Sequence, residues 1–170
     1  MLHIHSSFGK TVLILGLVGL LLSSPAVADT IEGTLNGEPR TWHVVKQGGS
    51  STANFSELVP GMQTVTLQGH VDDEFATQGT VSIGFTLMNG EMVSPPEASY
   101  FHTGKFVPNY GNQDTPRQWD LSVREIDGNT MHFAGQYAGT LKLQGKPTGD
   151  EPETIELDVT FDVNAVRTDM

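Results

Sequence analysis

Residues 154–165 alternate strictly between apolar and polar side chains, and no other feature constrains the fold of this chain as strongly. Successive side chains of a strand point to opposite faces, so this period predicts a strand with one buried and one solvated face. On a helix the same residues would be spread around the whole circumference. The predicted inward residues are Ile155, Leu157, Val159, Phe161 and Val163.

The same period recurs elsewhere after residue 28, where no stretch shows sustained helical spacing. Residues 54–58 are the one ambiguous piece, either a short helix or an edge strand. Asn36-Gly37 and Asn89-Gly90 are typical of tight hairpin turns between strands. The further inward rows are Val65, Leu67 and Val71; Val81, Ile83, Phe85 and Leu87; Trp119, Leu121 and Val123; and Met131, Phe133, Tyr137, Leu141 and Leu143.

This pattern predicts an all-β domain of eight or nine strands, because apolar residues line only one face of each strand. Antiparallel sheets with one solvated face give such alternation. Two of them packed face to face make a β-sandwich, the architecture we expect. A closed eight-stranded β-barrel would show a similar pattern and is the alternative.

The N-terminus has the composition of an export signal. Lys10 precedes a 12-residue apolar segment at positions 11–22, and Ala26 and Ala28 occupy the small positions that signal peptidase reads. A membrane-spanning helix needs about 20 apolar residues. We therefore predict a cleaved signal peptide over residues 1–28 and a single all-β domain over residues 29–170. The protein would be periplasmic or extracellular, with no transmembrane segment after cleavage.

Charge and motif content exclude several classes of function. Residues 29–170 hold 8 Lys and Arg against 20 Asp and Glu, a net charge of −12. Such a surface repels phosphate backbones, so we expect no nucleic-acid partner. The chain has no cysteine, which excludes thiol catalysis and Cys-ligated zinc. It also lacks a G-x-S-x-G elbow, an H-E-x-x-H pair and a phosphate-binding loop, so we expect neither an enzyme nor a cofactor.

The segment 100–119 is the best candidate for a binding site. Its central loop, residues 103–116, is unusually long for a compact domain, and long loops are often functional. Aromatic faces stack on the apolar face of a sugar ring, while amides and carboxylates bind its hydroxyls. Alternatively, the aromatic residues fill the open end of the sandwich. The predicted ligand-binding residues are Tyr100, Phe106, Asn109, Tyr110, Asn112, Asp114 and Trp119.

Four histidines follow residue 28, and none forms a ligand pair by its spacing. His70 and His132 fall on polar strand faces, where we expect exposed side chains. A copper or zinc site can also assemble from residues far apart in the sequence. The candidate ligands for such a site are His43, His102 and Met88 or Met92.

Together these features indicate an exported, non-catalytic binding or accessory module. We expect it to recognise a carbohydrate or another extracytoplasmic protein through the aromatic loop 100–119. One alternative is a lipocalin-like barrel that carries a small apolar ligand, which a cavity of roughly 300–1,000 Å³ would favour. The other is a metal-binding periplasmic protein, which the convergence of two histidines with a Met or a carboxylate would favour.

Overall fold

Strands account for all the regular structure of the described chain. The computed structural model describes residues 29–147 and 149–168, and within them it has thirteen strands and no helix. The all-β prediction is therefore confirmed. The predicted signal peptide, residues 1–28, lies outside the described residues. The strands are β1 (Thr30–Leu35), β2 (Glu38–His43), β3 (Lys46–Gln47), β4 (Ser50–Ser51), β5 (Ala53–Val59), β6 (Met62–Gly69), β7 (Thr80–Met88), β8 (Glu91–Met92), β9 (Glu97–Phe101), β10 (Asn109–Gly111), β11 (Arg117–Asp127), β12 (Thr130–Gln144) and β13 (Thr154–Arg167).

Eleven of these strands join one large sheet, and β3 and β4 form a small separate one. The order in the large sheet is β11-β12-β10-β9-β7-β6-β5-β13-β1-β2, with β8 beside β7. The sheet is mixed, where we expected an antiparallel one, because the end of β13 pairs in parallel with β5 over two residues. The strand number exceeds eight or nine because β3, β4, β8 and β10 have only two or three residues each. Such short pairings leave no period in the sequence.

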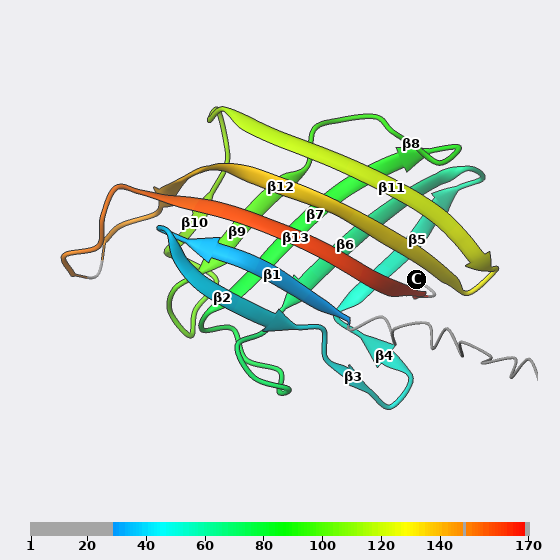
Figure 1. The fold of residues 1–170 in the computed structure, drawn as a ribbon, viewed down its shortest axis with the longest axis horizontal. Coiled ribbons are helices and arrows are strands. Elements are labelled where there is room, and N and C mark those ends of the chain that lie inside the picture. Colours follow the sequence, from blue (N-terminus) through cyan, green and yellow to red (C-terminus); the bar gives the residue numbers. More distant parts are fainter. Residues whose placement is uncertain (1–28, 148, 169–170) are drawn as a thin grey trace, which may run out of the picture.

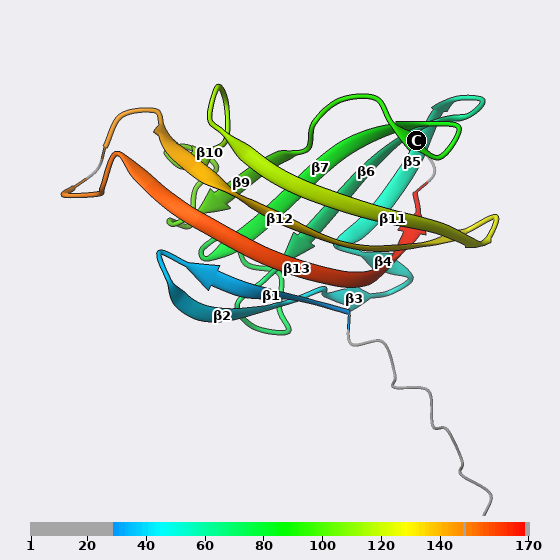
Figure 2. The ribbon, with the colours of Figure 1, turned by 45° about the horizontal axis from the view of Figure 1, so that its top comes forward.

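The two longest strands arrange the sheet as two layers. β12 pairs with β13 on one side, and with β11 and then β10 on the other. β13 pairs in the same way with β1 and then, at its end, with β5. Figures 1 and 2 show β11, β12, β13, β1 and β2 in one layer, the front layer, with β5, β6, β7 and β9 crossing behind it. We call β5, β6, β7, β9 and β10 the back layer.

Apolar side chains fill the space between the layers, as the alternation predicts. The nine inward residues of 80–88 and 154–165 each expose 6% of their surface or less. The rings of Phe85 in the back layer and Phe133 in the front layer meet edge to face, with centroids 5.5 Å apart. Asn36 and Asn89 have φ values of 52°, and the glycines that follow them are also left-handed, which confirms both predicted hairpin turns.

Two residues of the predicted inward rows are more exposed than expected. Trp119 lies on the same face of β11 as Leu121 and borders a hollow with Phe85, but it is 40% exposed because β11 is an edge strand. Val71 is 52% exposed because β6 ends before it, at Gly69. Residues 54–58, for which a short helix and an edge strand were both open, belong to strand β5, so the strand is confirmed. In each case the exposure or secondary structure of the residue depends on which strands are its neighbours. The local alternation of apolar and polar residues does not encode that arrangement.

Candidate functional site

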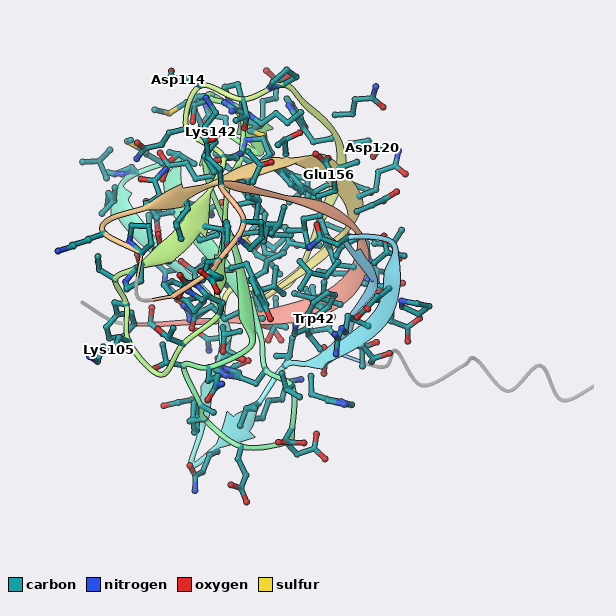
Figure 3. All side chains as sticks on the ribbon, turned by 90° about the vertical axis from the view of Figure 1, so that its left-hand side faces the viewer. Trp42, Lys105, Asp114, Asp120, Lys142 and Glu156 are labelled. Atoms are coloured by element: carbon teal, nitrogen blue, oxygen red, sulfur yellow. The ribbon has the colours of Figure 1, made fainter. Side chains whose placement is uncertain are left out.

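The segment 100–119 does not form a single loop. Residues Asn109–Gly111 are strand β10, which lies between β9 and β12 in the sheet and divides the segment. Figure 3 shows Asp114, from the second half, at the top of this end of the molecule and Lys105, from the first half, well below it on the left. The predicted ligand-binding residues are therefore distributed over more than one surface.

Two of the predicted residues are buried and hold this segment in place. Tyr110 exposes 2% of its surface, and its hydroxyl donates a hydrogen bond to the Pro152 carbonyl at 2.9 Å. Asn112 exposes 4%, and its Nδ2 donates to the Pro96 carbonyl at 2.9 Å. Burial, followed by the negative charge of Glu151, raises the pKa of Tyr110. These contacts give both side chains a structural role.

The other predicted residues have mixed surroundings. Tyr100 is half-buried on β9, and burial raises its pKa, although Arg40 opposes the shift. Asn109 is half-buried on β10, and Asp114 is exposed in a turn with φ 57°. Trp119 borders a hollow with Met92 and Pro96 at the edge of the core. Asn109 and Asn112 border another hollow, of about 100 Å³, which none of the other predicted residues lines.

Phe106, in contrast, lines a pocket, which we call the aromatic pocket. Its ring is 71% exposed and meets the ring of Phe101 edge to face, with centroids 5.8 Å apart. A third ring, Phe75, reaches the same hollow from the loop between β6 and β7 and is 53% exposed. The hollow has a volume of about 220 Å³ and opens to solvent. Gln68, His70, Thr77 and Thr80 supply its polar wall.

Strand register places this pocket on the outer face of the back layer. Thr80 of β7 is paired with Phe101 of β9, and Gln68 of β6 lies on the same face as both. The loop 71–79 forms the remaining wall. It is anchored at its end by Trp42, whose indole Nε1 donates to the Gly79 carbonyl at 2.9 Å. The pocket is thus built from three strands and two loops.

His70 supports the same loop from below and is not exposed as we expected. It exposes 6% of its surface because the loop folds back over it. Its Nδ1 lies 2.8 Å from the Ala76 carbonyl and 3.0 Å from the Thr80 hydroxyl. The ring also meets Phe75 edge to face at 6.0 Å. His70 therefore fixes the wall that presents Phe75. His132, the other expected surface histidine, is mostly buried and bonds Asp162 at 2.7 Å.

The chemistry of the aromatic pocket suits an uncharged ligand. Its lining contains no Asp, Glu, Lys or Arg, and His70 is the one ionisable side chain among the residues that border it. The Gln68 amide and the Thr77 hydroxyl make no hydrogen bond with the rest of the described chain, so both can bind a ligand. The three phenylalanine rings offer apolar surfaces beside them. A ligand with one apolar face and several hydroxyls fits this combination.

The two candidate metal-binding histidines lie against different carboxylates. His43 Nδ1 lies 3.5 Å from Asp73 Oδ1, and His102 Nε2 lies 3.6 Å from Glu151 Oε1. Met88 and Met92 belong to the β7–β8 hairpin. Among residues 29–147 and 149–168, no cluster of three or more His, Asp or Glu side chains is arranged to hold a metal ion. The same residues contain no helix with the length and hydropathy needed to cross a bilayer.

Comparisons with protein-family models, with curated proteins and with solved structures found no match to this chain. The site is therefore interpreted from its own residues. Sequence reasoning identified Phe106 but missed Phe75, Gln68 and Thr77. The available signal was Phe75 itself, a large apolar residue in the otherwise polar segment 72–79.

Proposed function

We propose that this protein is an exported, non-catalytic binding module that holds a carbohydrate in the aromatic pocket. The observation that carries the proposal is the gathering of three partly exposed phenylalanine rings around one hollow of about 220 Å³. Beside them lie the Gln68 amide and the Thr77 hydroxyl, which have no hydrogen-bond partner within residues 29–147 and 149–168. Folding alone would favour the burial of such rings. Apolar side chains that stay exposed in a cluster often mark a binding site. Sugar rings offer the matching combination of an apolar face and hydroxyl groups.

The size of the pocket narrows the class of ligand. Its volume of about 220 Å³ is below the roughly 300–1,000 Å³ that is typical of pockets for drug-sized molecules. One ring of a carbohydrate fits such a hollow better than a long lipid does. A lining without Lys or Arg favours a neutral sugar over a phosphorylated or sulfated one, because burying an anion without a permanently charged cation beside it is costly.

We also propose that the two layers form a β-sandwich, which bears on where a ligand can bind. The layers join through hydrogen bonds at the two corners where β12 meets β10 and β13 meets β5. A barrel that carries an apolar ligand needs an empty interior, whereas Phe85, Phe133 and Tyr137 occupy the space between these layers. The filled core supports binding at the outer surface.

The test is binding to a panel of neutral polysaccharides by affinity electrophoresis and calorimetry. The variant Phe75→Ala/Phe106→Ala removes two exposed rings, so its melting temperature should stay close to that of the wild type. Its affinity should fall by roughly fivefold or more for each ring, since an aromatic anchor contributes on the order of 1 kcal/mol or more. Val107→Ala is the matched control, because Val107 is 63% exposed beside Phe106 and does not line the pocket.

Two results would contradict the proposal. One is a wild-type protein that binds no member of the panel. The other is binding that the double variant leaves unchanged, which would place the carbohydrate site elsewhere on the surface.

A further inference from the structure

The outer face of the back layer carries hydroxyl and amide groups in rows across the strands. Thr64 pairs with Thr86, and Gln68 pairs with Ser82. Ser82 pairs in turn with Ser99 of β9. We call this surface the hydroxyl face and define it by Ser56, Thr64, Thr66, Gln68, Ser82, Gly84, Thr86, Glu97 and Ser99. Glu97 is its only ionisable residue, although the chain as a whole is strongly charged.

Three hollows among the described residues border this face, and strand β7 contributes to two of them, the aromatic pocket and a second hollow. The second hollow has a volume of about 270 Å³ and is bordered by Thr66, Gly84, Thr86, Pro95 and Glu97. Its floor is low because Gly84 has no side chain. A Cβ at Gly84 would have one neighbour within 4 Å, the Val65 carbonyl oxygen at 3.8 Å. The glycine therefore leaves space on the surface that packing of the core does not require.

The two hollows are aligned along strand β7. Thr80 borders the aromatic pocket and Gly84 the second hollow, four residues further along the strand. At roughly 3.3 Å per residue they are separated by about 13 Å. Ser82 lies between them on the same face, with Ser99 beside it. A continuous polar path therefore joins the aromatic pocket to the second hollow, and it is longer than one sugar ring.

We infer that the ligand is a linear, neutral polysaccharide that lies along β7, with one sugar in the aromatic pocket and a later sugar over Gly84. This inference rests on the proposed carbohydrate binding and adds the length and path of the ligand. Hydroxyl and amide side chains both donate and accept hydrogen bonds, as the repeated hydroxyls of a polysaccharide require. A protein partner would instead favour a patch with an apolar centre, and this face is apolar at one end only.

Charge selects a neutral chain over an acidic one. Neither hollow is bordered by Lys or Arg, and the carboxylate of Glu97 would repel a uronic acid or a sulfate. An acidic polysaccharide would therefore lack the cationic partners that its binding needs.

The test measures affinity against ligand length, using cello-, xylo-, manno- and malto-oligosaccharides from mono- to hexasaccharide as probes. For the series that binds, the affinity of the wild type should rise with length until the ligand spans both hollows. Gly84→Val places a branched side chain on the floor of the second hollow. We expect it to lower the affinity for the hexasaccharide about tenfold or more and to leave the affinity for the shortest binding ligand unchanged.

Two further variants complete the design. Thr66→Val keeps the side-chain shape and removes one hydroxyl, so it tests the same hollow even if Gly84→Val does not fold. We expect it to weaken hexasaccharide binding a fewfold. Thr160→Val is the control, because Thr160 points outward from β13 in the front layer. Its affinity should equal that of the wild type for every length.

The results separate this inference from the proposed function. If short and long ligands bind equally, and neither Gly84→Val nor Thr66→Val changes hexasaccharide affinity, the path along β7 is wrong while the aromatic pocket stands. Tighter binding of polygalacturonate than of any neutral chain would also overturn the inference. If the wild type binds none of the probes, both proposals fail together.

Discussion

Tyr110 and Phe106 are close in sequence, yet the structure gives them opposite roles. Tyr110 is 2% exposed in the core and Phe106 is 71% exposed. Tyr110→Ala removes a buried ring that meets His102 at 5.0 Å and leaves the Pro152 carbonyl without its donor. We expect the free energy of unfolding to fall by about 3–5 kcal/mol, the usual result for truncating a buried aromatic side chain. Phe106→Ala should change it by less than about 0.5 kcal/mol.

Equilibrium urea unfolding measures both variants, with the fluorescence of buried Trp42 as the signal. Tyr110→Phe is the intermediate case, because it keeps the ring and removes only the hydrogen bond to Pro152. It should cost about 1 kcal/mol, the typical net contribution of one hydrogen bond. The reasoning is refuted if Phe106→Ala proves more destabilising than Tyr110→Ala. It is also refuted if Tyr110→Ala loses ligand binding at full stability, because Tyr110 would then belong to the site.

Three further predictions concern pH and processing. Burial raises the pKa of all three tyrosines above 10.0, so the unfolded chain loses these protons at a lower pH than the folded protein does. The free energy of unfolding should therefore fall as pH rises beyond 10.0. Tyrosinate absorbance should appear at higher pH in native than in urea-unfolded protein. A hydrogen bond from the Gly61 N–H, followed by one from Arg167, lowers the pKa of Glu57 from 4.5. The stability that these two hydrogen bonds give to the folded protein is present above pH 4.5 and is lost as pH falls through the lowered pKa of Glu57. Replacing Glu57 with Gln should therefore make the free energy of unfolding less dependent on pH in acid. Mass spectrometry of exported protein should find a chain that begins at Asp29, and a chain that retains residues 11–22 would contradict the predicted signal peptide.

Local patterns were sufficient to predict the core and the main turns. Alternation identifies the inward residues of β7 and β13 because each strand is long enough for the period to repeat. The Asn-Gly pairs identify two hairpins because only a few residues adopt left-handed φ values easily. The same rule did not predict the 40% exposure of Trp119, because alternation does not distinguish a central strand from an edge strand such as β11.

The candidate site was predictable only in part. The sequence of residues 109–111 predicts a loop, because Asn and Gly flank Tyr110. In the structure these residues form a strand, because they pair with β9 and β12. That pairing buries Tyr110 and separates it from Phe106. Phe75 comes from a loop some thirty residues earlier. Its position depends on the hydrogen bond between Trp42 and Gly79, a contact between layers that no local pattern encodes.

The same alternation that builds the core also builds the hydroxyl face, and this separates binding from stability. On β7, Val81, Ile83 and Phe85 point into the core, so Ser82 and Gly84 must point out of the back layer. The outward residues contribute little to burial and can change without loss of the fold. A side chain larger than that of glycine would fit at position 84. It would also favour a strand more than glycine does. The surface is nevertheless hollow at this position. An empty position that folding does not require is what a ligand path along β7 needs.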